Sequence, residues 1–229
     1  MAQKTVAQLQ ALWVTGYAPT QQDFSDLFES FLNFLTNNDR LSPDEKTYIP
    51  SPQDVYIQYI PNPYIKKVTA MCQISGSNVI ISNNAYITTC IIVNASGSFN
   101  VFSALSNSLL STLLFFAKIE FYSIIIDDNA NLTAILTNSL IATNFVYVRN
   151  NAALQGFALL ITPTCLHIDL TNCNYDVSFV NGMLTQANNL GGLNGVFKIE
   201  GGTNAAPTDG ALNSDIVDLI AKGWTVTYN

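Results

Sequence analysis

The 229-residue sequence predicts an α+β solenoid, in which a short N-terminal helical anchor precedes a strand-rich stack of similar coils. The main observation is a skeleton of two alternating apolar residues, an asparagine and then a leucine or isoleucine, which recurs at a nearly constant spacing along the chain. The second observation is the composition, since charged residues make up only 11% of the chain and asparagine is abundant. Ordinary soluble domains have roughly 25% charged residues. The surface must therefore be largely uncharged and polar, which suits a β-rich solenoid.

Residues 1–38 predict two short helices that form an attachment module. Thr5 and Thr20 are suitable N-cap residues, and Gly16 and Pro19 separate the two helices. The apolar residues of the second helix recur at i, i+3, i+4 and i+7, which makes a continuous amphipathic stripe. Two alternatives remain open: the stripe packs on the rest of this chain, or it packs on another subunit or a larger assembly. The anchor residues are Leu12, Trp13, Phe24, Leu27, Phe28, Phe31, Leu32 and Leu35.

Residues 39–56 are predicted to be a linker, because prolines and charged residues are concentrated there. The repeat domain then occupies residues 57–229. It divides into a cap at 57–75, strand-rich coils at 76–175 and helix-containing repeats at 176–229. The cap is expected to be irregular because prolines flank its asparagine on both sides.

Each repeat is defined by a reference residue, usually asparagine, that follows the alternating apolar pair. The pair lies five and three residues before the reference residue, and a leucine or isoleucine follows it by three residues. In the last repeat of the series Asp176 stands at that following position. The reference residues, spaced by 22 or 23 positions, are Asn62, Asn84, Asn107, Asn129, Asn151 and Cys173.

An asparagine at the reference position has a structural role. The alternating pair predicts a short strand with both side chains facing inward. The turn that follows leaves backbone N–H and C=O groups inside the coil. An inward asparagine has two donors and an acceptor, so it can bond these groups in its own coil and in the next one. Cysteine at the same position is a small, weak substitute.

After the sixth repeat the period lengthens, because the return arm of each coil is predicted to be a helix. The helices are expected at 177–188 and 213–222, and they alternate with strands at 196–200 and 224–229. In the first of these longer repeats, Gly202 stands where the asparagine would be.

A period of roughly 20–29 residues is typical of leucine-rich repeats. The segments Ile126-Asp-Asp-Asn129-Ala-Asn-Leu132 and Val148-Arg-Asn-Asn151-Ala-Ala-Leu154 resemble the leucine-rich repeats of Bacteroidetes surface proteins and of the phages that infect this phylum. The tail, from Lys198 to Pro207 and from Leu219 to Val226, resembles a C-terminal unit of the same proteins. The chain departs from the pattern in that many leucine positions hold isoleucine, valine or phenylalanine.

The N-terminal segments Leu9-Gln-Ala-Leu-Trp-Val-Thr-Gly16 and Asp26-Leu-Phe-Glu-Ser-Phe31 resemble an attachment module in fibre and appendage proteins of these phages, including crAss-like ones. The resemblance implies a non-enzymatic head or tail fibre or decoration protein of the virion. It would be assembled in the host cytoplasm, which agrees with an N-terminus that lacks a signal-peptide core. Capsid or tail proteins would bind the N-terminal helices, and the chain would be a homo-oligomer such as a trimer.

The residues that alternate with the inward pairs face outward and form the candidate binding face. This face contains aromatic rings beside acidic and basic groups, a combination that suits recognition of a host-surface glycan or protein. The alternative is that its charged residues only pair between adjacent coils and keep the sheet soluble. The members of the candidate binding face are Ile125, Asp127, Phe145, Tyr147, Arg149, His167, Asp169 and Lys198.

Other functional classes find little support in the sequence. There is no Gly-x-Ser-x-Gly beside His167 and Asp169, no phosphate-binding loop and no His-Glu-x-x-His, so we expect no catalytic residues, no metal and no cofactor. The four cysteines lack metal-type spacing and are expected to be buried thiols. A net charge of −7 disfavours nucleic acid, and no apolar run reaches the ~20 residues of a membrane span. The alternative to a virion protein is a bacterial binding module for glycan or protein.

Overall fold

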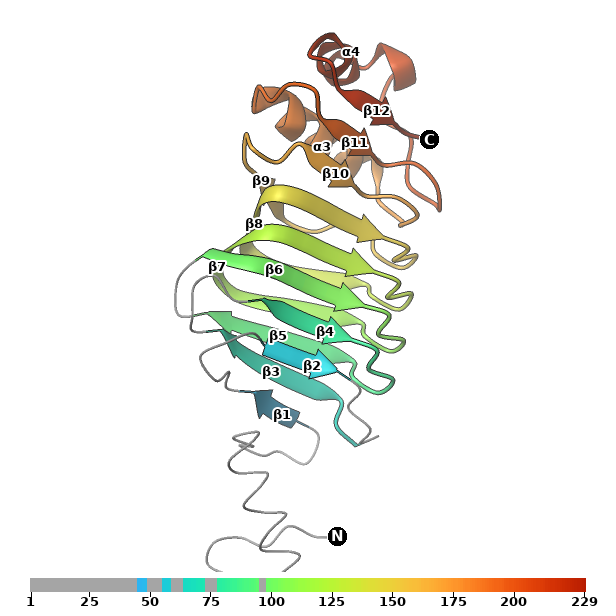
Figure 1. Cartoon of the computed structure of the whole chain (residues 1–229). Coiled ribbons are helices and arrows are strands. Elements are labelled where there is room, and N and C mark those ends of the chain that lie inside the picture. Colours follow the sequence, from blue (N-terminus) through green and yellow to red (C-terminus); the bar gives the residue numbers. More distant parts are fainter. Residues whose placement is uncertain (1–44, 49–54, 59–63, 73–77, 95–97) are drawn as a thin grey trace, which may run out of the picture.

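The computed structural model describes residues 45–48, 55–58, 64–72, 78–94 and 98–229. Both predicted N-terminal helices, all eight anchor residues and the reference residue Asn62 lie outside these ranges. The described residues form a parallel β-solenoid that carries two helices near its C-terminal end (Figure 1). The coarse prediction of a strand-rich solenoid with helices in its last repeats is therefore confirmed.

The strands are β1 (Glu45–Tyr48), β2 (Val55–Gln58), β3 (Lys67–Cys72), β4 (Val79–Ser82), β5 (Thr89–Asn94), β6 (Ser98–Leu105), β7 (Thr112–Asp127), β8 (Ala134–Arg149), β9 (Leu159–Ile161), β10 (His167–Asp169), β11 (Val196–Lys198) and β12 (Thr225–Thr227). The helices are α3 (Val177–Asn189) and α4 (Ser214–Ala221), and a 3-10 turn, η1 (Gly210–Leu212), precedes α4. All pairings among these strands are parallel.

The central coils have three sides, which we name the front, the back and the third side. The front contains β2, β4, the C-terminal ends of β6, β7 and β8, and then β10, β11 and β12. The back contains β1, β3, β5 and the N-terminal ends of β7 and β8. The start of β6, the middles of β7 and β8, and β9 form the third side. β7 and β8 are 16 residues long and cover all three sides, with register shifts after Phe115 and Phe121.

The sequence predicted one short strand per repeat, on what is now the front. A second periodic signal was present for the back, where buried residues recur at the same spacing as the reference residues. These are Val68, Cys90, Leu113 and Ile135, which lie opposite one another in register. Their side chains differ in size and type, so the repeat is weaker in the sequence than that of the asparagine.

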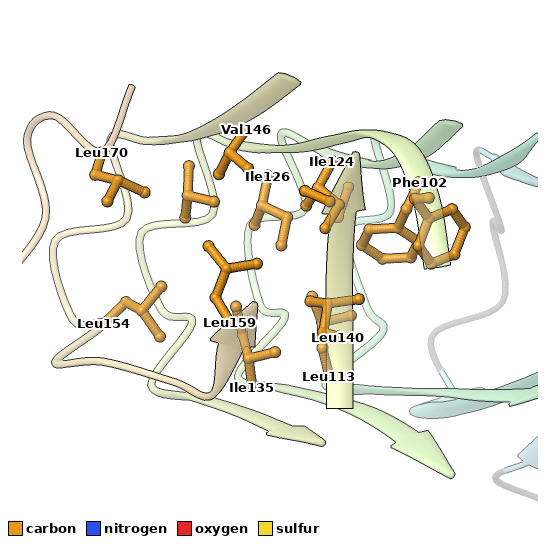
Figure 2. Packing of buried hydrophobic residues seen from close by; sticks show 14 of the residues in the cluster. Phe102, Leu113, Ile124, Ile126, Ile135, Leu140, Val146, Leu154, Leu159 and Leu170 are labelled. Atoms are coloured by element: carbon orange, nitrogen blue, oxygen red, sulfur yellow. The ribbon is translucent and has the colours of Figure 1, made fainter. Parts of the chain in front are cut away.

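The interior is filled from all three sides (Figure 2). Ile124 and Val146 of the front point toward Leu113 and Ile135 of the back, with Leu140 of the third side between them. All five are at most 3% exposed. Since each coil covers the apolar edge of the next, the core runs without interruption along the stack.

The start of the solenoid differs from the predicted boundary at residue 57. β1 lies inside the predicted linker 39–56 and pairs with β3, with Glu45 opposite Lys67. β2 begins at Val55 and pairs with β4. The stack thus begins at residue 45 in the described chain. Charge and proline content hid this strand, because its pairing depends on the coil that follows it and not on its own composition.

The two C-terminal helices follow the prediction closely. Asp176 caps α3 by accepting a hydrogen bond from the Phe179 N–H at 2.7 Å, and Asn213 caps α4 by accepting one from the Asp215 N–H at 3.0 Å. The change from strand to helix has a specific boundary at β9. The Gln186 amide accepts from the Ile161 N–H at 2.5 Å and donates to the Leu159 carbonyl at 3.1 Å. The Gln186 side chain of α3 thus bonds the backbone N–H and C=O groups of β9 that would otherwise pair with a further strand.

Candidate functional site

A ladder of buried asparagines runs through the turn between the front and the back. Asn129 is fully buried, and its Nδ2 donates to the carbonyls of Ala104 and Asp127, both at 2.9 Å. Its Oδ1 accepts from the backbone N–H and the Nδ2 of Asn107, both at 3.0 Å. Asn129 therefore bonds its own coil and, through its Nδ2 and the Oδ1 of Asn151 at 3.3 Å, the next coil, as the sequence predicted. Its bonds to the preceding coil were not predicted.

The rungs repeat with the same geometry. Asn151 donates to the carbonyls of Ile126 at 2.7 Å and Arg149 at 2.8 Å, and its Oδ1 accepts from the Asn129 N–H at 3.1 Å. At the other end Asn84 donates to the Ile57 carbonyl at 2.9 Å. These amides thus satisfy buried backbone N–H and C=O groups of the turn in successive coils.

A second feature of the turn was not predicted. The residue directly before each rung has a left-handed backbone conformation, with φ between 52° and 58°. Asparagine, aspartate and serine stand at these positions, and the first two tolerate this conformation best among non-glycine residues. In three successive coils their side chains bond one another, since Asn150 donates to Asp128 at 2.9 Å and Asn172 donates to Asn150 at 3.0 Å. The residues are Asn83, Ser106, Asp128, Asn150 and Asn172.

Cys173 interrupts the ladder. Its Sγ donates to the carbonyls of Val148 at 3.4 Å and Thr171 at 3.5 Å, which are the positions that an asparagine amide reaches in the coils before it. Tyr175 is 1% exposed and stacks on Phe179 at 4.4 Å between ring centroids, so it fills the space of the leucine that is missing at Asp176. Burial raises the pKa of both the Cys173 thiol and the Tyr175 hydroxyl.

Gly202 stands at the register position of the reference residue, as the sequence indicated, because it forms a parallel β-bridge with Cys173. A Cβ on Gly202 would meet the Cys173 carbonyl oxygen at 2.7 Å, so no side chain fits at this position. Asn204 instead accepts from the Tyr175 N–H at 3.0 Å and donates to the carbonyls of Leu170 at 3.0 Å and Ile199 at 2.9 Å. The close approach of two backbones requires glycine, so the rung moves two residues along the chain.

Replacing Cys173 by asparagine is expected to stabilise the chain by about 1 kcal/mol, because a weak thiol donor is exchanged for an amide that fits the repeated geometry. The new Oδ1 would also accept from the Asn151 N–H, as Asn151 does for Asn129. Urea unfolding of the two proteins measures the difference. A lower midpoint for Cys173→Asn would show that the thiol is required by the packing of Tyr175 and not merely tolerated.

The outer surface of the front brings most of the candidate binding face together. Phe145 stacks on His167 at 5.2 Å and on Tyr147 at 6.1 Å between ring centroids. Tyr122, which was not among the predicted residues, meets Phe145 edge-on at 6.0 Å and is 52% exposed. It sits at the register shift of β7 after Phe121, where the alternation of inward and outward residues is lost, and for this reason the pattern did not reveal it.

The charged members of the face are paired with one another. Arg149 forms an ion pair with Asp127 through both carboxylate oxygens and lies 4.0 Å from Asp169. Its guanidinium also lies 5.1 Å from the centroid of the Tyr147 ring. Asp127 faces outward but is only 6% exposed, and its hydrogen bond raises the pKa of Arg149 above the usual value. For these three charges the structure agrees with the alternative of pairing between adjacent coils.

The remaining members lie in the same rows of the sheet. Ile125, Tyr147, Asp169 and Lys198 occupy successive register positions on neighbouring strands. The rings of Phe145, Tyr147 and His167 are close to parallel, with interplanar angles of 23° for Phe145 and Tyr147 and 30° for Phe145 and His167. Such contacts between rings on one strand and on neighbouring strands stabilise the sheet.

In the described ranges, no group of three or more His, Cys, Asp and Glu residues is arranged so that it could hold a metal. The three cysteines whose side chains are described are buried, and Cys165 and Cys173 are free thiols, as predicted. Neither of the two described helices has the length and apolarity that a membrane span requires. The chain matches no protein-family model, no curated protein and no solved structure with which it was compared.

Proposed function

We propose that this chain is a non-enzymatic structural protein of a phage virion, a head or tail fibre or decoration protein that is anchored by its N-terminal segment and projects the solenoid. The observation that carries the proposal is the continuous interior of the central coils. Apolar side chains and asparagine amides with 0% exposure occupy it from Asn84 to Asn151. A filled interior of this kind serves length and rigidity, because each coil adds about 4.8 Å of hydrogen-bonded stack.

The resemblance of residues 9–16 and 26–31 to a phage attachment module supports the choice of a virion over other assemblies. The predicted stripe of the second N-terminal helix would bind capsid or tail proteins. A homo-oligomer in the virion is part of the proposal, since fibres are commonly built from several copies of one chain.

Particles assembled with variant chains provide the test. Phe28→Ala together with Phe31→Ala is expected to reduce incorporation of the chain into purified particles by about tenfold or more, because two large anchors of the stripe are removed. Ser30→Ala together with Asn33→Ala changes the opposite side of the same predicted helix and is expected to leave incorporation unchanged. Mass spectrometry of the particles measures both. Absence of the unmodified chain from particles would refute the proposal.

A bacterial binding module is the alternative, and the aromatic cluster around Phe145 favours it. On an array of surface glycans, binding that is lost in Tyr147→Ala but kept in Tyr64→Ala, a tyrosine 76% exposed on another part of the chain, would support recognition by the front. Binding that is absent, or equal in both variants, would leave the front with its role in stabilising the sheet.

A further inference from the structure

The back of the solenoid carries an apolar surface, which we name the back face. Its exposed members are Phe116 and Leu136, Leu114 is half-buried, and Ile91 at its edge is buried. Ile91, Leu114 and Leu136 lie opposite one another on β5, β7 and β8. Phe116 is 58% exposed and Leu136 is 56% exposed. Apolar side chains at successive positions across a sheet form a continuous patch, unlike single exposed residues, and such patches mark interaction sites.

The back face also differs from the front in charge. None of the residues in 89–93, 112–116 and 134–137 is charged, whereas the front carries the ion pair of Asp127 and Arg149. Between β7 and β8 the surface is hollowed into a depression of about 390 Å³ that Leu114, Phe116 and Leu136 help to line. The Thr137 hydroxyl, which also lines it, is buried and has no hydrogen-bond partner among the described residues.

We propose that a second copy of this chain covers the back face, sheet against sheet, in a twofold contact. In a twofold contact the same patch is used on both chains, so a charged residue near the axis would meet its own kind. Two copies of a chain of net charge −7 therefore repel each other least where the contact surface has no charged residues. The segments of β5, β7 and β8 at the back face provide such a surface. Two such faces pack about 10 Å apart, a spacing at which Phe116 and Leu136 of one copy reach the depression of the other.

This inference goes beyond the proposed function, because association through the back face does not depend on a virion. Its test is the mass of the full chain in solution, measured by sedimentation equilibrium. The unmodified chain of 25.0 kDa is expected to form a dimer. Leu136→Lys is expected to weaken the dimer by about tenfold or more, since a charge is placed opposite its own copy. Ile220→Lys is the matched control, because Ile220 is also 56% exposed but lies on α4.

A second measurement does not depend on how the lysine variant folds. Leu136→Cys is a small change at an exposed site, and mild oxidation is expected to link two copies through it, whereas Ile220→Cys is expected to stay unlinked. An unmodified chain that sediments as a monomer would overturn the proposal. In that case residues 20–35 of the same chain are the alternative cover for the back face. A dimer that Leu136→Lys does not weaken, or that Leu136→Cys does not link, would place the interface elsewhere and equally overturn it.

Discussion

Replacement of Asn129 by alanine is expected to lower the free energy of unfolding by about 3 kcal/mol or more, because several buried polar groups lose their partners together. The carbonyls of Ala104 and Asp127 lose a donor, and the N–H of Asn107 loses its acceptor. Each orphaned group costs roughly 1–3 kcal/mol when it stays buried, although the costs do not add fully. Urea unfolding followed by circular dichroism measures the change.

The control for this variant is Asn131→Ala, two residues further along the same turn. Asn131 is exposed, and the hydrogen bond found for its side chain is one to the Ser108 carbonyl at 2.6 Å. Its loss is expected to cost less than about 1 kcal/mol, because water replaces the partner. Equal effects at the two positions would contradict the role of the buried ladder.

Replacement of Phe121 by alanine is expected to destabilise the chain by about 3–5 kcal/mol, the range for a buried phenylalanine that leaves a cavity. Phe121 is fully buried at the corner between the third side and the front. Its ring centroid lies 5.5 Å from the centroids of both Phe99 and Phe102 in the preceding coil. The cavity would therefore lie between two coils, where the stack depends on contact with its neighbours. Thermal and urea unfolding both measure the effect.

The neighbouring Tyr122 is the control, since it is of similar size and differs mainly in burial. Tyr122→Ala removes one edge-on ring contact with Phe145 and is expected to cost less than about 1.5 kcal/mol. A larger loss for Tyr122→Ala than for Phe121→Ala would mean that the inward and outward directions at this corner are reversed.

The parts of the fold that could be predicted from the sequence are those that repeat or are local. The inward direction of Val146 and Val148 follows from alternation within one strand, and the role of Asn129 follows from its place after such a strand. The caps Asp176 and Asn213 act within their own helices. In each case the evidence lies within a few residues of the position itself.

The parts that could not be predicted depend on contacts with the next coil. Tyr175 is buried because the leucine expected at Asp176 is absent and Phe179 stands beside it. Asn204 acts as a rung because Gly202 and Cys173 approach too closely for a side chain. Asp127 is outward and yet buried because Arg149, from the following coil, covers it. The sequence around each of these residues contains no pattern that indicates the contact.

By itself the sequence determined the length of the coil, the positions that face inward, the asparagine ladder and the two C-terminal helices, because these follow from periodicity and from the chemistry of single residues. The tertiary structure alone decided that the central coils have three sides, that the stack begins at β1, that the charges of the front compensate one another and that the back face is left apolar. Those features depend on which residues lie opposite one another when strands from successive repeats pair. The side chains that then meet across the sheet are neighbours in space but not in the chain.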